Sequence, residues 1–461
     1  MANIKDKICI VGAGLAGTTI AMYLEKKGYN NYVVYEKSDK VSSKAYSPIM
    51  PVRNANSEWE DRNIEMGLFC ASRKSPALFE CEEFASFSHV DGPKTEKKLK
   101  NEDNTEFVVP FKTKLKAELK LKKFFSILKS KYMGFDVSGH KGFAAGYYDG
   151  LSYTDLRSVN GKNEFLKNLS LPFSEFLLKN HCLELVDFFR ETFTALGYGF
   201  LDEIPAAYVL KLLNINSLDD FNNPNKLLTW KKGSGTIFEN ISKKLKHPVV
   251  LNSEVTKIER KKDTKGLDKV YVYINNSETY EVFDKVIICT GLDSYLTYSD
   301  ASETEHELFS KIEYSKLMSM AVKISEDVAP ESSCIYPEHL SKFALGHMLG
   351  FYLRFPDATA QPLVTYTLRN YANSEEVSLE KAKENTIADL EKAGYKVEEI
   401  LELKDYYFLP HVSSASYADG WYDKVEALQG ENNTFFASEV MSFTNIEEVA
   451  KYSKELVKKF F

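Results

Sequence analysis

Three glycines and one acid near the start of the chain have the types and the spacing that bind a dinucleotide. Gly12, Gly14 and Gly17 form a GxGxxG turn, and Glu36 follows 19 residues after the last glycine. Gly12 allows a tight turn, Gly14 lets the backbone approach a pyrophosphate, and Gly17 lets a helix and a strand pack closely. A helix N-terminus attracts anions because its free N–H groups and its dipole point toward them. The pattern therefore predicts a pyrophosphate at the turn and ribose hydroxyls on the acid.

The elements that must position this turn form a βαβ unit. An apolar run at residues 8–11 is typical of a buried parallel strand, a helical stretch covers residues 18–27, and a second strand at residues 32–35 leads into the acid. GxGxxG alone is a weak signal, but this flanking context makes it more specific. We expect nucleotide contacts at Gly12, Gly14, Ala16, Gly17 and Glu36.

Composition limits the class of protein. The chain has 461 residues, enough for two or three domains, with 44% apolar and 27% charged residues, which is ordinary globular usage. The net charge of −7 argues against a nucleic-acid partner, because such proteins normally carry a basic bias. Six cysteines without CxxC spacing are typical of reduced thiols in a cytoplasmic protein. The eight histidines show no HxxxH or Cys/His cluster, so we expect no metal site, and nothing in the sequence indicates an oligomeric state.

Three further motifs resemble those of the flavin amine oxidases. Residues 36–44 are similar to the E-x5-GG-[RK] continuation of that family, residues 65–67 resemble the short motif that follows it, and residues 434–439 resemble its C-terminal strand with a Gly-Glu or Gly-Asp. The resemblance implies that the cofactor is FAD and that both ends of the chain hold it. It implies cofactor contacts at Lys37, Ser43, Lys44, Glu65, Met66, Val255, Ser438 and Glu439.

Serine stands at three places where those motifs have glycine, namely Ser42, Ser43 and Ser438. If the backbone there has positive φ or touches phosphate, each side chain costs about 1 kcal/mol or more. Serine is small and can itself donate a hydrogen bond to phosphate, so we expect FAD binding that is retained but weakened. A protein that has lost FAD is the alternative.

Longer stretches are similar to the bacterial polyenoic fatty acid isomerases, an FAD-dependent family. They comprise residues 89–94, 171–177, 193–199, 204–211, 410–414 and 420–422. The resemblance implies hydride abstraction from a polyunsaturated acyl chain to flavin N5 and its return to another carbon, which moves a double bond. Such chemistry needs no acid–base pair, only a flavin held beside the reacting carbon in a dry tunnel. The alternatives are an FAD-dependent oxidase or desaturase of a hydrophobic substrate and a flavin-free binding protein.

The resemblance also implies an anchor for a fatty-acid carboxylate at the tunnel entrance. Lys97 stands where the family has an arginine, and Leu196 stands at the family's aromatic position. Lysine lacks the bidentate fork, so its grip should be looser, and the substrate could be another polyene, a shorter acid or a carrier-bound acyl chain. A run of lysines is more often a solvated face, and Trp421 could equally be a core residue. The expected substrate contacts are Lys97, Phe193, Leu196, Tyr198 and Trp421.

A basic amphipathic helix is expected at residues 113–132, where apolar side chains recur at helical spacing among lysines. Such a helix can rest on an anionic membrane or micelle surface and collect substrate there. More often it packs its apolar stripe on the core while the lysines reach into solvent, and we favour that interpretation.

The order of the motifs predicts an α/β fold in three parts. A discontinuous Rossmann-like FAD domain, of the glutathione reductase/amine oxidase type, takes residues 1–80, 220–290 and 425–461. A mainly helical cap takes residues 90–215, and a mixed-sheet substrate domain takes residues 291–424. We expect the ligand tunnel between cap and sheet, opening onto the flavin.

Overall fold

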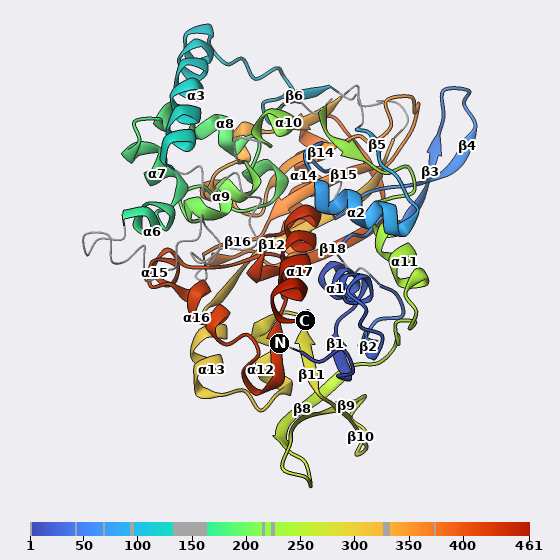
Figure 1. The fold of residues 1–461 in the computed structure, drawn as a ribbon. Helices are drawn as coiled ribbons and strands as arrows, with labels where there is room; N and C mark the ends of the chain where they lie inside the picture. The colour runs from blue at the N-terminus through green and yellow to red at the C-terminus, as the bar shows by residue number, and fades with distance from the viewer. Residues whose placement is uncertain are drawn as a thin grey trace.

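Two larger sheets and a group of helices build the protein (Figure 1). The computed structural model describes residues 2–41, 44–67, 70–92, 96–131, 164–213, 217–222, 226–325, 332–372 and 375–461. Ser42 and Ser43, and the last residue of the expected basic helix, lie outside these residues.

A four-stranded parallel sheet gathers strands from the start, the middle and the end of the chain. Its order is β19-β11-β1-β2. The strands are β1 (Ile8–Val11), β2 (Tyr32–Tyr35), β11 (Lys285–Ile288) and β19 (Thr434–Phe436). Every residue of β1 is buried, and β1 pairs in parallel with β2 on one side and β11 on the other. Such uniformly apolar strands are typical of a parallel sheet covered on both faces.

Helices and a smaller sheet cover this parallel sheet. Helix α1 (Leu15–Lys26) packs against the C-terminal helix α17 (Ile446–Phe460), and the two lie side by side in Figure 1. The first helix begins three residues earlier than the sequence suggested, directly after Gly14. The other covering elements are α2 (Pro76–Ala85), α11 (Gly235–Lys244) and the antiparallel strands β8 (Val255–Lys262), β9 (Asp268–Ile274) and β10 (Tyr280–Phe283).

A six-stranded mixed sheet forms the second layer, in the order β18-β12-β15-β14-β13-β6. Its strands are β6 (Lys97–Leu99), β12 (Ile312–Ile324), β13 (Ser333–Ile335), β14 (Met348–Tyr352), β15 (Leu363–Leu368) and β18 (Val397–Val412). All neighbours are antiparallel except β13 and β6. Strand β6 comes from the stretch expected to be mainly helical, and it places Lys97 at the edge of this sheet. Helix α14 (Leu379–Lys392) packs on β14, β15 and β18.

The cap consists of the helices that lie within residues 111–222. They are α3 (Phe111–Lys131), α6 (Glu164–Leu169), α7 (Phe173–Lys179), η3 (Leu183–Leu185), α8 (Val186–Arg190), η4 (Thr194–Leu196), α9 (Ala206–Leu212) and α10 (Leu218–Asn222). Phe124 of α3 is buried edge-on against Phe189, with ring centroids 5.2 Å apart. The second half of α3 therefore packs on the cap core, as we favoured, whereas its first half leaves Phe111, Leu115 and Leu119 exposed.

Short elements complete the fold. They are β3 (Ile49–Arg53), β4 (Trp59–Asn63), β5 (Val90–Asp91), β7 (Leu228–Thr229), α12 (Leu292–Tyr298), α13 (Glu303–Phe309), η6 (Pro337–His339), η7 (Lys342–Ala344), β16 (Asn370–Tyr371), β17 (Glu375–Glu376), α15 (Ser414–Ala418), α16 (Trp421–Ala427), η8 (Glu431–Asn433) and η9 (Glu439–Met441). Among the described residues, no helix has the length and apolar character needed to cross a membrane.

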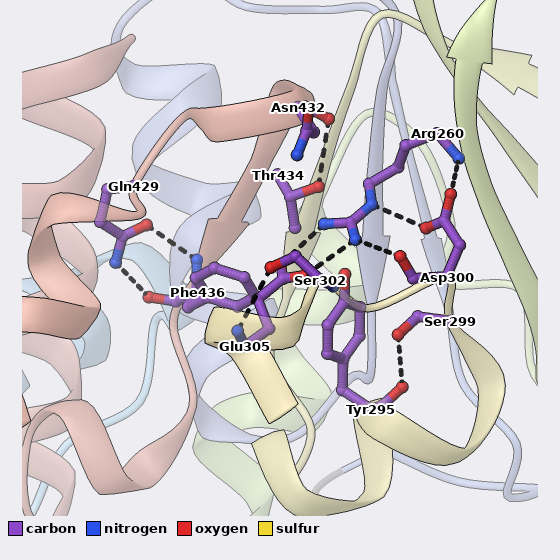
Figure 2. Close-up of polar contacts among 10 residues, drawn as sticks. All are labelled: Arg260, Tyr295, Ser299, Asp300, Ser302, Glu305, Gln429, Asn432, Thr434 and Phe436. Atoms are coloured by element: carbon purple, nitrogen blue, oxygen red, sulfur yellow. Dashed lines mark hydrogen bonds and ion pairs between the residues drawn. The ribbon is translucent and has the colours of Figure 1, made fainter. Parts of the chain in front are cut away.

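Gln429 covers the outer edge of β19, the strand that leads to Ser438 and Glu439. Its side-chain amide donates to the Phe436 carbonyl and accepts from the Phe436 N–H, both at 2.8 Å (Figure 2). Edge strands otherwise leave such backbone groups without a strand partner. The side chain therefore makes the two hydrogen bonds that a neighbouring strand would make, and it holds the end of β19 in place.

Arg260 of β8 holds helix α13 and the loop before it (Figure 2). Its guanidinium donates to the two carboxylate oxygens of Glu305 at 2.7 and 2.8 Å, and to the Asp300 carboxylate at 2.7 Å. Glu305 also completes a capping box with Ser302 at the start of α13. The side chains of Arg260 and Glu305 are each 5% exposed. A buried, bidentate pair of this kind depends on both partners, because either charge alone would be left without compensation.

We expect Glu305→Gln to lower the free energy of unfolding by about 3 kcal/mol, because it removes the buried bidentate partner of Arg260 and leaves only the more exposed Asp300 to compensate that charge. Glu307→Gln on the same helix is the matched control, since its side chain is 67% exposed and pairs with Lys311 at the surface. That change should cost less than about 1 kcal/mol. Urea denaturation followed by circular dichroism measures both, and equal losses would contradict the role assigned to the buried pair.

Candidate functional site

The carboxyl ends of the four parallel strands meet at one edge of their sheet. β1 leads into Gly12, β2 into Glu36, β11 into Thr290, and β19 into Ser438. Ligands of open α/β sheets bind at this edge, where the connections diverge. The predicted nucleotide residues from both ends of the chain are therefore brought together.

The glycine turn has the shape of a phosphate cradle. Gly12 has a φ of 96°, which favours glycine, and a Cβ on Gly17 would lie 1.8 Å from the Gly12 carbonyl oxygen. Only glycine therefore lets α1 begin so close to β1. A Cβ on Gly14 would meet no atom within 4 Å, so the backbone there faces open space. The first N–H groups of α1 point to that space without helical partners, which suits a pyrophosphate.

Glu36 is fixed beside the turn. Its carboxylate accepts hydrogen bonds from the Ala13 N–H at 2.8 Å and from the Ser38 N–H at 3.0 Å. A carboxylate has about four acceptor positions, so two remain for ribose hydroxyls. Lys37 is exposed next to it, and Val255 is buried at the start of β8.

Lys44 and Glu439 join the two ends of the chain through an ion pair at 2.5 Å. Ser438, directly before Glu439, is buried and has a φ of −64°. A penalty from positive φ therefore does not apply to serine at this position, because any residue adopts that conformation without strain.

Glu65 is fully buried next to the loop that carries Lys44. It accepts hydrogen bonds from the Ser47 hydroxyl at 2.5 Å and from the Ser234 N–H at 2.7 Å, and it lies 3.2 Å from the guanidinium of Arg354. Burial raises the pKa of its carboxyl, and Arg354 opposes that shift. Met66 beside it is a core residue. The structure therefore gives both residues a supporting position, and direct contact with the cofactor stays a prediction.

The Glu65 segment also supports the loop that carries Lys44. A Cβ on Gly67 would lie 1.9 Å from the Lys44 carbonyl oxygen, and one on Gly235 would lie 2.4 Å from that of Ala45. These close approaches pack the Glu65 segment and the first residue of α11 against the loop that carries Lys44. Sequence reasoning missed Arg354, although an arginine among apolar residues at positions 348–355 indicates a buried charge that needs an acid.

Lys97 and Leu196, the two residues aligned with the carboxylate anchor, line one largely apolar cavity. Its described lining residues are Cys70, Lys97, Glu191, Thr192, Ala195, Leu196, Phe221, Leu227, Ser333, Cys334, Ile335, Gly350, Phe351, Tyr352 and Tyr366. The cavity lies between the cap and the mixed sheet, as expected. Tyr352 interacts with Arg354, so one wall of the cavity adjoins the Glu65–Arg354 pair.

Glu191 shares the polar end of this cavity with Lys97, and sequence reasoning missed it. Burial lowers the pKa of the Lys97 ammonium, and the Glu191 charge opposes that shift. Burial likewise raises the pKa of Glu191, opposed first by Lys97. Lys97 is therefore a half-buried cation that shares a cavity with the opposite charge of Glu191.

The other predicted substrate residues lie outside this lining. Phe193 and Tyr198 are buried with ring centroids 5.2 Å apart, and the Tyr198 hydroxyl donates to the Thr444 carbonyl at 3.0 Å. Trp421 is a core residue whose indole N–H donates to the Leu308 carbonyl at 2.8 Å. The structure does not bring Trp421 together with Lys97.

Comparison with known proteins identifies the family. Residues 15–446 match the family model described as flavin containing amine oxidoreductase. The chain belongs to this family. The crystal structure of the CLA-producing fatty acid isomerase from P. acnes is similar over 100% of both chains, with 33% identity and a TM-score of 0.87. Putrescine oxidase bound to putrescine covers 98% of both chains at 12% identity and a TM-score of 0.66, which supports the fold alone.

A curated relative adds the cofactor type. The FAD-dependent oxidoreductase dpasF of Apiospora sacchari is 24% identical over 276 residues, which are 59% of this chain and 58% of that protein. The chain thus spans a little over half the length of that relative. The cofactor is FAD, and the open cradle at Gly14 and the free acceptor positions of Glu36 fit its pyrophosphate and ribose. The expected fold class and the resemblance to the fatty acid isomerases are confirmed.

We expect Gly14→Ala to weaken FAD binding at least tenfold while the apoprotein keeps its stability, because the added methyl meets no protein atom and can only oppose the pyrophosphate. FAD content after dialysis and the melting temperature of the apoprotein measure the two effects. Gly266→Ala, in the turn between β8 and β9, is the opposite control: its φ of 77° strains an alanine, so this change should lower the melting temperature and leave FAD affinity unchanged. Unchanged FAD affinity in Gly14→Ala would contradict the placement of the pyrophosphate.

Proposed function

We propose that the protein is a flavin-dependent double-bond isomerase that acts on a polyunsaturated fatty acid or a related acyl chain. The observation that carries this proposal is that Lys97 and Leu196 line the same cavity between cap and sheet. These two positions align with the carboxylate anchor of the fatty acid isomerases. The P. acnes isomerase, similar over the whole chain, supports the same reaction class.

The cavity residues hold and orient the substrate. Apolar side chains such as Leu227, Ile335 and Phe351 exclude water and accept the hydrocarbon chain. Lys97 holds the carboxylate at the polar end, and the fixed distance from that end selects which carbons face the cofactor. FAD, when bound, supplies the acceptor and donor of the transferred hydride.

Glu191 weakens the hold of Lys97 on a charged head group. A substrate carboxylate near Lys97 also approaches Glu191, so one negative charge must be neutralised or moved away. The raised pKa of Glu191 lets that carboxyl take up a proton more easily than an ordinary glutamate. We infer that the site grips a free carboxylate loosely and tolerates an uncharged head, such as a carrier-bound acyl group.

The test is anaerobic incubation of the FAD-loaded protein with a panel of polyenoic acids and their esters. An isomerase forms a conjugated diene, detected by its ultraviolet absorbance, without consuming oxygen. We expect Lys97→Ala to raise the KM for free acids by about 10- to 100-fold, the equivalent of about 1.5–3 kcal/mol for a hydrogen bond to a charged group. The KM for esters should change little.

Lys98→Ala is the matched control. Lys98 is the next residue of β6, so its side chain points to the other face of the sheet, where it lies 3.5 Å from Glu96. Its kinetics should match the wild-type protein. Peroxide formation in step with turnover in air, and no product without oxygen, would replace the isomerase with the oxidase alternative. Equal kinetics for Lys97→Ala and the wild-type protein would remove Lys97 from the site.

We also propose that the protein is cytoplasmic, since its six cysteines are free thiols.

We further propose that α3 contacts a membrane surface. Phe111, Leu115 and Leu119 lie at i, i+4 and i+8 on α3 and are exposed, and Phe111 is 78% exposed. Lysines surround this stripe. An apolar stripe with a basic border suits the surface of an anionic bilayer, where fatty acids partition. In Figure 1, α3 extends away from both sheets.

Cosedimentation with phosphatidylserine-containing vesicles tests this contact. We expect Leu115→Gln/Leu119→Gln to lose most binding, because the change removes apolar area that would enter the bilayer. Phe343→Gln is the control, since Phe343 is 91% exposed on η7, outside α3. Equal binding by both variants, or no binding by the wild-type protein, would contradict the contact.

A further inference from the structure

Three side chains that can bind a metal converge away from the cavity described above. Glu313 of β12 and His411 of β18 are direct cross-strand partners in the antiparallel pair. Glu203 approaches them from the turn before α9. One ligand atom from each residue lies within 4.8 Å of the other two, and His411 Nε2 is 3.9 Å from a Glu313 carboxylate oxygen.

The orientation of His411 points to a ligand. Its Nδ1 lies 2.7 Å from the Leu409 carbonyl oxygen, which can only accept, so Nδ1 carries the hydrogen. Nε2 therefore presents a lone pair toward the two carboxylates. The side chain is 2% exposed, and Nε2 has no hydrogen-bond partner among the described residues. A buried lone pair that faces carboxylates is unfavourable unless a cation or a proton lies between them.

The protonation tendencies agree with this geometry. Burial lowers the pKa of His411 to about 4. Burial raises the pKa of Glu203 to about 7, and the neighbouring Glu313 and Asp202 charges add to the shift. The Ala372 N–H and Lys342 oppose it.

We propose that Glu203, Glu313 and His411 bind one divalent transition-metal cation of the Zn²⁺ type. One imidazole nitrogen and two carboxylate oxygens are zinc ligands, and three protein ligands leave a fourth position for water. Zinc–ligand bonds of about 2.0–2.2 Å place tetrahedral ligand atoms roughly 3.4 Å apart, so small side-chain rotations would close the site. The hydrogen bond from Nδ1 to Leu409 is the usual outer contact of a metal-binding histidine.

The surroundings allow an ion to enter. The three side chains line a hollow together with Pro205, Tyr371, Ala372, Ser413, Ser414 and Ala415. None of these described residues belongs to the lining that contains Lys97. A bound cation would tie the turn before α9 to the β12–β18 pair, and so connect the cap to the mixed sheet.

A second histidine cluster is the natural comparison. His339, His347 and Asp389 also lie close together. There, His339 Nε2 is 3.2 Å from the Glu102 carboxylate, and His347 Nδ1 is 3.0 Å from Asp389. These nitrogens already have partners, so we assign the metal to the cluster of His411.

Calorimetric titration of Zn²⁺ into the chelator-treated, FAD-loaded full chain tests the proposal. We expect one zinc ion per chain, and at least tenfold weaker binding in His411→Gln and in Glu203→Gln. Zinc should bind more tightly than Mn²⁺, following the general order of divalent affinities. Glu203→Gln keeps the side-chain volume at a half-buried position, so it tests the site even where replacement of the buried histidine disturbs folding.

His347→Asn is the matched control and should bind zinc like the wild-type protein. FAD absorbance and circular dichroism show that each variant is folded. No zinc uptake by the wild-type protein would overturn the proposal. Uptake that is unchanged in both His411→Gln and Glu203→Gln, or lost only in His347→Asn, would overturn it too.

Discussion

The close approach of helix α1 to the turn after β1 is the constraint on which the cofactor site depends. A Cβ at Gly17 would overlap the carbonyl oxygen of Gly12, so the helix can begin at this point only because position 17 has no side chain. The N-terminus of α1 thereby points its free N–H groups and its dipole at the edge of the parallel sheet. Since every strand of that sheet has the same direction, the same edge also receives Glu36 and Ser438. One steric contact therefore positions a site to which both ends of the chain contribute.

Two charge pairs, one partly exposed and one buried, hold the segments around that site. Lys44 and Glu439 pair across nearly the whole length of the sequence, and Glu65 and Arg354 pair beneath the loop that carries Lys44. A buried charge that loses its partner is strongly destabilising, so the Glu65–Arg354 pair specifies which of these segments meet. The resemblance implies a cofactor contact at Glu65, which stays a prediction, and the structure adds that Glu65 also holds Ser47, Ser234 and Arg354 together.

The polar end of the cavity between cap and mixed sheet carries charges of both signs. Lys97 shares its partly buried position with Glu191, and each charge moderates the pKa shift that burial imposes on the other. A lysine ammonium is a compact point charge, and Glu191 partly neutralises it before any substrate arrives. At a different place, Glu313 and His411 of the mixed sheet meet Glu203 from the cap, so that two carboxylates lie close to a histidine. Both clusters arise where the cap meets the mixed sheet, because burial there brings side chains from separate elements into one low-dielectric region.

The sequence by itself determined the βαβ unit, the dinucleotide cradle and the family. Glycine spacing, apolar runs and an acid at the end of a strand are local patterns, and local patterns can be recognised from the sequence alone. It also indicated Lys97 and Leu196, through alignment with a family rather than through spacing. Only the tertiary structure decided that Glu191 opposes Lys97, that Arg354 supports Glu65, and that Trp421 lies away from the cavity. Likewise, Glu203, Glu313 and His411 come together through strand register and a cap turn. These contacts join residues separated by up to about two hundred and ninety positions, and no local propensity encodes which distant side chains share one buried space.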